Sequence, residues 1–411
     1  MTSRPRVLIT GMGVASPAGV GLMEFHAAQF GGRSGVRAIR SYEAAGDGVR
    51  IAGEVDIPAD MDLARREALK TDRCTRLAAA ATRQALEDAN IADVSELDRA
   101  RVGVVIGSGV GGATSAEQNY LTYFREGPDG LRARAIPMAM INDASAWVAI
   151  NYGFRGPCTT VATACASGAD AIVAGYQMIA LGEADIVLAG GTDAPITRTI
   201  VSGFDKLGAL SRRNDDPAGA SRPFSADRTG FVIAEGSAVV VLESEKSARA
   251  RGVRAHAELR GFGRTSDAHH VTMPHPDGRG ACEAMLQALR SADAAPGDVR
   301  MVNAHGTSTT LNDAIEARAV RAALGTASAP VTATKSLIGH TLGAAGAIEA
   351  VATVQALASG MIPPVLNLED VDPEIELDLV RGEARKMAPG LALSNSFAFG
   401  GHNVVLAFAP A

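Results

Sequence analysis

Short hydrophobic runs alternate along this chain with longer stretches in which apolar residues have helical spacing. The runs at 7–10, 102–107, 185–191 and 238–243 are rich in valine, isoleucine and leucine and have the length of buried strands. The stretch at 77–89 (LAAAATRQALEDA) is typical of a helix. Buried strands that alternate with helices predict an α/β fold.

The same order of features occurs twice along the chain. Residues 7–17 and 256–268 are both strands that run into a glycine-rich turn. Residues 164–184 and 335–360 each have a turn of small residues that opens a long helix. The two pairs predict a duplicated fold within one compact unit, with chance similarity of glycine-rich segments as the alternative.

Length, composition and charge agree with a large globular protein of two repeats. A chain of 411 residues is longer than one ordinary hydrophobic core supports, and we expect one repeat at 1–255 and the other at 256–411. Apolar residues make up 47% of the chain and charged residues 20%, so core material is ample. The net charge is −6 with both signs interspersed, which favours neither nucleic acid nor a membrane surface as a partner.

The cysteines and the first apolar run bear on the cellular compartment. Cys74, Cys158, Cys165 and Cys282 have neither C-x-x-C spacing nor the density of a secreted disulfide scaffold, so reduced thiols are expected. The first apolar run is short and broken by glycines, which favours a buried strand over a signal peptide or membrane span. We therefore expect a cytoplasmic protein without a membrane span.

Cys165 has the sequence setting of a nucleophile. It lies where an extended Thr/Val stretch gives way to small residues and then to a helix, which places the thiol near a helix N-terminus. The helix dipole and free amides there are expected to lower the pKa of the thiol and to form an oxyanion site for an attacked thioester. Taken by itself, the residue could instead be a small buried apolar side chain.

Two histidines share matching strand–turn–helix settings. His305 follows an apolar run, and His340 lies beside glycine just before a helix. A lone histidine is usually structural, but two in matching settings favour a site with Cys165. In such a site the thiolate carries an acyl group, and two neutral imidazoles stabilise the enolate formed when a malonyl thioester loses carbon dioxide. This chemistry requires no metal or redox cofactor.

Four motifs in order resemble those of the elongating β-ketoacyl-[acyl carrier protein] synthases of the Cys-His-His type. They are TACASG around Cys165, NAHGTST around His305, TKSLIGH around His340 and NSFAFGGHN at 395–403, and the likeness covers nearly the whole chain. The resemblance implies a thiolase-like fold of two βαβαβαββ halves in a five-layered αβαβα core, and a homodimer. It also implies decarboxylative condensation in fatty-acid elongation, with substrates carried on the phosphopantetheine arm of acyl carrier protein. The GGHN ending resembles actinobacterial members.

The resemblance implies roles for residues beside the three reacting groups. The backbone amides of Cys165 and Phe399 are expected to form the acyl oxyanion hole. Phe399 is expected to gate access between the acyl and malonyl steps, with Gly400 and Gly401 permitting the movement.

Further roles follow from the same likeness. Lys335 and Glu316 are expected to order the histidines and a water, with a solvated pair at a helix end as the alternative. Thr307 and Thr309 resemble the hydroxyls that bind the phosphopantetheine arm, and Val110 falls where the family tunes the depth of the acyl pocket. These three positions could also be ordinary turn or core residues.

Carrier-protein docking is expected to use cations near the pocket mouth, with solvated surface charge as the alternative. Gly208 stands where relatives have a further basic residue, with Lys206 two residues earlier, which leaves room for a specialised carrier protein. The matching cations are Arg65, Arg66, Lys70, Arg132 and Arg134.

A histidine-rich loop is the other candidate site. His269, His270 and His275 could suggest a metal cluster, yet the family has a histidine-containing loop here without a required metal. We therefore expect no metal, and we expect His402 not to be catalytic.

Several functions share these motifs. The first alternative is a ketosynthase subunit of a type II polyketide or polyene pathway, paired with a chain-length factor. A noncatalytic chain-length factor would share the fold, but retention of Cys165, His305 and His340 disfavours it. A degradative thiolase is expected to use a second cysteine as base, and an initiating synthase an asparagine in place of the second histidine, so both are disfavoured as well.

Overall fold

The computed structural model describes residues 5–91 and 97–411, and its elements fall into two successive repeats. The strands of the first repeat are β1 (Val7–Ser16), β2 (Gly19–Val20), β3 (Val36–Ala38), β4 (Ile51–Gly53), β5 (Val102–Gly107), β6 (Cys158–Thr159), β7 (Ile186–Asp193) and β8 (Gly236–Ser244). Its helices are α1 (Leu22–Gly31), α2 (Arg65–Ala68), α3 (Arg73–Asp88), α4 (Ala113–Glu126), α5 (Ala135–Ala139), α6 (Asp143–Tyr152), α7 (Ser167–Ala180), α8 (Arg198–Lys206) and α9 (Glu245–Arg251).

The second repeat has a corresponding set of elements. Its strands are β9 (Ala257–Ser266), β10 (Val299–Asn303), β11 (Val331–Thr332), β12 (Met361–Ile362), β13 (Arg385–Lys386), β14 (Leu391–Ala398) and β15 (His402–Ala409). Its helices are α10 (Arg279–Ser291), α11 (Thr310–Leu324), α12 (Lys335–Ile338) and α13 (Ala345–Ser359).

The two repeats build the same sheet. The strand order is β6-β5-β7-β8-β1 in the first and β11-β10-β14-β15-β9 in the second, so each is 3-2-4-5-1 in order of appearance. In both, the first three strands are parallel and the last two antiparallel to their neighbours. With α3, α6 and α7 in one and α10, α11 and α13 in the other, each repeat is βαβαβαββ. The predicted duplication is confirmed, and the boundary at residue 255 stays a prediction.

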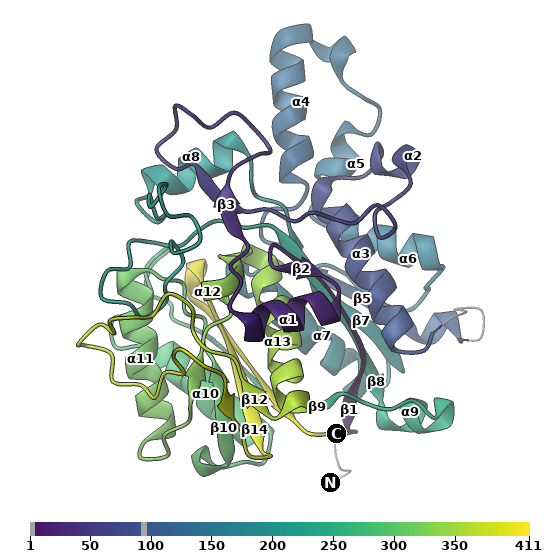
Figure 1. Ribbon diagram of the computed structural model, residues 1–411. Helices are drawn as coiled ribbons and strands as arrows, with labels where there is room; N and C mark the ends of the chain where they lie inside the picture. The colour runs from purple at the N-terminus through teal and green to yellow at the C-terminus, as the bar shows by residue number, and fades with distance from the viewer. Residues whose placement is uncertain (1–4, 92–96) are drawn as a thin grey trace.

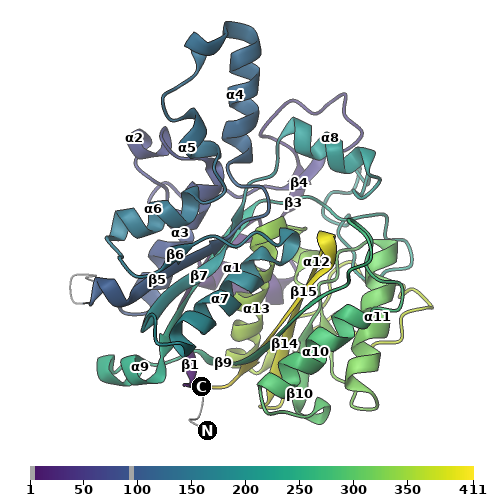
Figure 2. The same cartoon turned by 180° about the vertical axis from the view of Figure 1, so that it is seen from behind.

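The sheets and helices form five layers. β1 pairs with β9 at Leu8 and Ile9, which joins the two sheets edge to edge. α7 and α13 lie between the sheets, and Figures 1 and 2 show both helices at the centre of the molecule. α3 and α6 cover the outer face of the first sheet, and α10 and α11 cover that of the second. The order of layers is therefore αβαβα.

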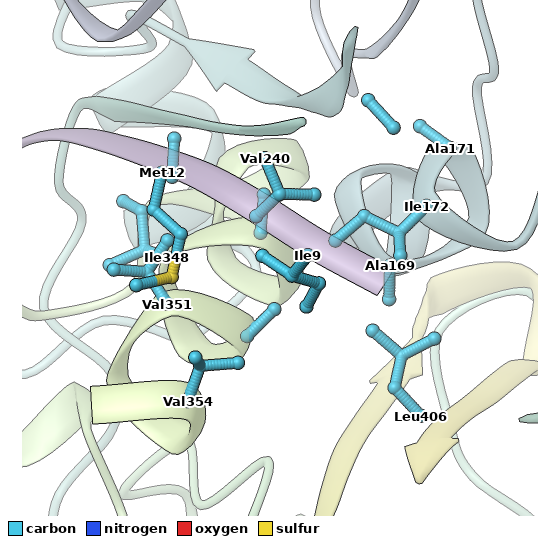
Figure 3. Packing of buried hydrophobic residues seen from close by; sticks show 14 of the residues in the cluster. Ile9, Met12, Ala169, Ala171, Ile172, Val240, Ile348, Val351, Val354 and Leu406 are labelled. Atoms are coloured by element: carbon cyan, nitrogen blue, oxygen red, sulfur yellow. The ribbon is translucent and has the colours of Figure 1, made fainter. Parts of the chain in front are cut away.

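Small and branched apolar side chains fill the centre. In Figure 3, Ile9 and Met12 of β1 lie among Ile172 of α7 and Ile348 and Val351 of α13. All five are buried, and the cluster continues to β8 and β15. Since side chains from both repeats interdigitate here, this core fixes the two central helices relative to each other.

Close helix-to-strand packing explains a glycine in β1. A Cβ at Gly13 would lie 2.0 Å from the carbonyl oxygen of Ala81 in α3. The expected strand at 7–10 extends through this glycine to Ser16 because α3 covers it without a side chain between them. The expected helix at 77–89 begins earlier, at Arg73, because the Asp72 side chain accepts from the backbone N–H of Cys74 and caps it.

Among the described residues, one stretch, Leu342–Ser359, is long and apolar enough to cross a membrane by length and composition. It contains the central helix α13, and 83% of it is buried inside the protein. Its hydropathy follows from contacts on all sides within the core.

Candidate active site

Cys165 lies in a sharp turn at the N-terminus of α7, as the sequence predicts. The turn is a 3₁₀ segment, Ala164–Ala166, that leads directly into the helix. Ala164 has φ of 49°, a left-handed conformation that strains a residue with a Cβ. The Ser167 hydroxyl donates to the carbonyl of Ala164 at 2.6 Å and accepts from the N–H of Thr163 at 2.9 Å. These bonds hold the strained turn in place.

The thiol of Cys165 is not activated in the way we expected. The side chain packs against the apolar cluster that includes Phe231 and Leu342, and burial raises the pKa of the thiol to about 12. The charge of Lys335 and hydrogen bonds from the backbone N–H groups of Phe399 and Cys165 lower the pKa only in part. The prediction of a lowered thiol pKa is therefore wrong, because desolvation outweighs the favourable groups. Those two N–H groups do face the sulfur, where an acyl oxyanion hole would lie.

The two histidines lie side by side and are neutral. His305 follows β10 and His340 follows α12, and their rings meet edge to face with centroids 5.4 Å apart. Burial lowers the pKa of both rings well below the usual value, and the nearby charge of Lys335 lowers it further. Each ring therefore has one N–H donor at neutral pH.

Lys335 fixes the orientation of the His305 ring through contacts with its Nδ1 atom and its backbone carbonyl. Its Nζ donates to the carbonyl of His305 at 2.7 Å and lies 3.1 Å from the Nδ1 of the same ring. Because an ammonium group has only donors, Nδ1 accepts and the ring proton sits on Nε2. Lys335 also forms a buried ion pair with Glu349 of α13.

Glu349 is a residue that the sequence analysis missed. Burial raises the pKa of its carboxyl group to about 7, and the ion pair with Lys335 opposes that rise. The available signal was its isolation, since Glu349 is the one charged residue between His340 and Ser359. A lone carboxylate in a buried apolar helix requires a buried counter-charge.

Glu316 has a different task from Lys335. Its carboxylate accepts from the backbone N–H groups of His305 and Gly306 at 2.8 Å each, and from the Asn395 amide at 3.1 Å. It therefore holds the backbone of the His305 turn rather than the ring. Both Lys335 and Glu316 are buried, so the alternative of a solvated helix-end pair is wrong.

Phe399 begins a glycine turn between β14 and β15. Gly400 and Gly401 have φ of 83° and 74°, in the region that favours glycine. The N–H of Gly400 donates to the carbonyl of Val271 at 2.7 Å, and the N–H of Asp267 donates to the carbonyl of Gly401 at 2.8 Å. Backbone bonds to the 267–271 segment thus hold the turn that carries Phe399.

A cavity of about 410 Å³ brings most of the expected site residues together. Val110 does not line it but packs against the same apolar cluster as Cys165. The hydroxyls of Thr307 and Thr309 are 2.8 Å apart and hydrogen-bonded to each other. The expected site residues that line the cavity are Cys165, His305, His340, Thr307, Thr309 and Phe399.

The five expected docking cations gather on another surface. They lie on or beside α2 and α5, two helices that are neighbours in both Figure 1 and Figure 2, and none of them lines the cavity. Lys70 is paired with Glu67 at 3.1 Å, while the four arginines are exposed. Gly208 lines the cavity, and Lys206 is exposed at the end of α8.

The histidine-rich loop is not arranged as a cluster of ligands. The rings of His269 and His275 have centroids 5.1 Å apart, while Nδ1 of His270 accepts from the backbone N–H groups of Thr272 and Met273. Within 5–91 and 97–411 there is no group of three or more His, Cys, Asp or Glu side chains placed to hold a metal ion.

Comparison with known proteins assigns the family. The model of the beta-ketoacyl synthase N-terminal domain matches residues 4–248, and that of the C-terminal domain matches residues 256–369. The chain belongs to the beta-ketoacyl synthase family. The thiolase-like α/β fold implied by the motifs is thereby confirmed, in agreement with the duplicated sheets.

Relatives and solved structures match this beta-ketoacyl synthase over its full length. The 3-oxoacyl-[acyl-carrier-protein] synthase 2 of Synechocystis sp. is 44% identical, with 98% of each chain covered, and that of Coxiella burnetii is 42% identical, with 98% and 97% covered. Neither relative supports the suggested actinobacterial source.

Two similar solved structures are named as ketosynthases. One is a type II polyketide ketosynthase bound to a hexaketide and in complex with its acyl-carrier protein (TM-score 0.91, 32% identity). The other is the ishigamide ketosynthase/chain length factor (TM-score 0.93, 33% identity). Both matches cover 100% of this chain and 100% of the other.

Proposed function

We propose that this beta-ketoacyl synthase is a 3-oxoacyl-[acyl carrier protein] synthase of fatty-acid elongation. It condenses an acyl group on Cys165 with malonyl-[acyl carrier protein]. The observation that carries the proposal is the placement of two neutral imidazoles and a thiol in one cavity, with the proton of His305 assigned to Nε2 by Lys335. The relatives at 44% and 42% identity have this activity in their names.

The first half-reaction transfers the acyl group. The sulfur of Cys165 attacks the carbonyl carbon of the acyl thioester, and the backbone N–H groups of Cys165 and Phe399 receive the negative charge on oxygen. The new carbon–sulfur bond forms as the bond to the phosphopantetheine sulfur breaks. The proton of the Cys165 thiol ends on that departing sulfur.

The second half-reaction forms the carbon–carbon bond. The thioester carbonyl of the malonyl group accepts from the ring N–H groups of His305 and His340, so that negative charge on this oxygen is stabilised as carbon dioxide leaves. The resulting carbanion attacks the acyl carbon on Cys165. The carbon–sulfur bond to the enzyme breaks, and the cysteine takes up a proton.

Neighbouring residues bind the substrate. The hydroxyls of Thr307 and Thr309 line the cavity and can bond the amide groups of the phosphopantetheine arm. Val110 limits the space available to the acyl chain beyond Cys165. The positive surface for acyl carrier protein is supplied by the cations on and beside α2 and α5, namely Arg65, Arg66, Lys70, Arg132 and Arg134.

The protein acts as a cytoplasmic homodimer in this proposal. An apolar surface is exposed on α4, α5 and α6, where Phe124, Ile136 and Ile150 have 81%, 71% and 80% of their surface accessible. β6, the edge strand of the first sheet, is also exposed at Cys158 and Thr159. An apolar surface beside an open sheet edge fits a second copy of the chain.

A ketosynthase subunit of a type II polyketide or polyene pathway is the second candidate. It is supported by full-length similarity to two ketosynthases, one of them named with a type II polyketide acyl-carrier protein and the other with a chain length factor. The two functions differ in subunit composition: the elongation enzyme is active as a homodimer, whereas a ketosynthase subunit requires a chain-length factor.

Intact-mass measurement tests the proposal. Wild type and Cys165→Ala are exposed briefly to a panel of acyl carrier-protein thioesters, and malonyl-[acyl carrier protein] is then added. We expect a mass gain in wild type alone, followed by its loss together with carbon dioxide release. Absence of any gain with purified homodimer contradicts the elongation function. Recovery on addition of a chain-length factor supports the second candidate.

A further inference from the structure

A buried carboxylate lies between the two repeats, behind the reacting residues. Asp193 is the last residue of β7 and is 0% exposed. Burial raises the pKa of its carboxyl group to about 6, while its hydrogen-bond donors lower it, so the group is mainly ionised at neutral pH. Neither the motifs nor the proposed mechanism gives this carboxylate a task.

The two oxygens of Asp193 bond different parts of the chain. Oδ1 accepts from the Ser108 hydroxyl at 2.6 Å and from the N–H groups of Gly109 and Val110 at 3.2 Å each. Oδ2 accepts from the N–H of Gly109 at 2.9 Å and from the N–H of Gly343 at 2.6 Å. Oδ1 therefore bonds donors of the first repeat alone, whereas Oδ2 bonds one donor from each repeat.

Those donors belong to the segments that carry the site. Gly343 lies three residues after His340, in a turn whose Leu342 has φ of 48°, matching Ala164 beside the nucleophile at 49°. A Cβ at Gly343 would lie 2.4 Å from the nitrogen of Gly109 and 2.7 Å from the carboxylate. The backbones of both repeats thus meet around one charged group, and neither can shift without the other.

We propose that Asp193 is a positioning residue, which sets the distance between the thiol of Cys165 and the imidazole of His340 by joining the 108–110 loop to Gly343. The inference rests on the proposed function, because it assigns the two half-reactions to these two groups. The N–H of Gly343 reaches Oδ2 alone, so this oxygen supports the decarboxylation turn. Oδ1 holds Ser108 and Val110 at the wall of the acyl pocket, and the N–H of Gly109 bonds both oxygens.

Asp193→Asn separates the two tasks. The amide oxygen can take the place of Oδ1 and keep the bonds from the 108–110 loop. The amide nitrogen then faces the N–H groups of Gly109 and Gly343, donor against donor; Gly109 still has the amide oxygen as acceptor, whereas Gly343 has no second acceptor on this side chain. We expect acylation of Cys165 to stay within about threefold of wild type. Carbon dioxide release from the acylated enzyme should fall by about 10²-fold, the effect of a displacement of about 1 Å.

Ser108→Ala disturbs the bonds at Oδ1, whereas Asp193→Asn disturbs those at Oδ2. It removes the hydroxyl that donates to Oδ1 and accepts from the N–H of Gly111 at 2.9 Å, so it loosens the Val110 loop and leaves Gly343 bonded. We expect a higher KM for acyl-[acyl carrier protein] in acylation and an unchanged rate of carbon dioxide release. This variant also tests the inference if Asp193→Asn does not fold.

Glu243→Gln is the matched control, because Glu243 is a buried carboxylate on the adjacent strand β8 that bonds Thr10, Ser247 and Arg251 rather than the site. It should lose stability while both half-reactions keep wild-type rates. Equal loss of both half-reactions in Asp193→Asn and in Ser108→Ala would overturn the inference. Failure of wild type to acquire an acyl group would instead refute the proposed function.

Discussion

At the scale of single residues, burial and hydrogen bonds determine the protonation state of each group in the site. Lys335 donates to His305 and pairs with Glu349, all inside the protein. The neutral imidazoles and the protonated thiol follow from the same desolvation, since burial disfavours every charged form. Three predictions belong to this scale.

Lys335→Met removes the group that keeps the proton of His305 on Nε2. We expect carbon dioxide release from enzyme already acylated on Cys165 to fall by about 10²–10³-fold, as for the loss of an oxyanion donor. The free energy of unfolding should fall by about 3 kcal/mol because Glu349 loses its partner. The double variant Lys335→Met/Glu349→Leu should regain stability but not activity; wild-type activity in either variant would show that the tautomer is unimportant.

The reactivity of Cys165 should follow its raised pKa. Alkylation by iodoacetamide, followed by intact mass, should accelerate about tenfold per pH unit between about pH 7 and pH 9 without reaching a plateau, since the thiolate reacts. Cys165→Ser gives the background from the other three cysteines. A plateau below about pH 8 would mean that the helix N-terminus lowers the pKa of the thiol more than burial raises it.

The buried histidines should make the fold sensitive to acid. Their pKa values lie well below the usual value of 6.5 in the folded protein, so as pH falls below 6.5 only the unfolded chain takes up these protons. Stability is therefore lost as pH falls, by up to about 1.4 kcal/mol per pH unit for each ring. His340→Asn should remove the contribution of one ring, up to about 1.4 kcal/mol per pH unit, from the slope of the free energy of unfolding against pH, measured by urea unfolding between pH 6.5 and about pH 5. Equal slopes for wild type and variant would contradict a buried neutral His340.

At the scale of elements, packing depends on close backbone contact. α3 lies directly on β1, where Gly13 faces the carbonyl of Ala81. Gly13→Ala should reduce the free energy of unfolding by about 1–3 kcal/mol, because its Cβ has no space and the helix must move. Gly31→Ala in α1, which meets nothing within 4 Å, is the control and should be neutral or slightly stabilising. Similar urea midpoints for both would show that α3 adjusts freely.

At the scale of the whole molecule, the proposed homodimer uses the exposed apolar surface of α4, α5 and α6. α4 projects from the body in Figures 1 and 2 and carries Phe124 with 81% of its surface accessible. Phe124→Glu should shift the protein from dimer to monomer in light scattering, since a buried charge at an interface is unfavourable. Leu181→Glu, at the end of α7 and 75% exposed, should leave the dimer intact. A monomeric wild type would rule out the proposed assembly.

The fold of two repeats follows from patterns that are local in the sequence. Strand and helix periodicity predicts the elements. The paired turns at 164–184 and 335–360 and the four motifs predict the settings of Cys165, His305 and His340. Both kinds of prediction succeed because backbone geometry and turn chemistry depend on near neighbours in the sequence. The structure places all three residues in one cavity.

Only the tertiary structure decided how those residues are charged and held. The thiol pKa depends on apolar side chains and on Lys335, which are distant in sequence, so the local setting at a helix N-terminus gave the wrong direction. Glu349 bonds a partner 14 residues away along the chain, and Asp193 bonds one 150 residues away. Desolvation and hydrogen bonding between distant segments are properties of the packed molecule. The isolation of Glu349 in an apolar helix signals a buried counter-charge, but it does not identify Lys335 as the partner.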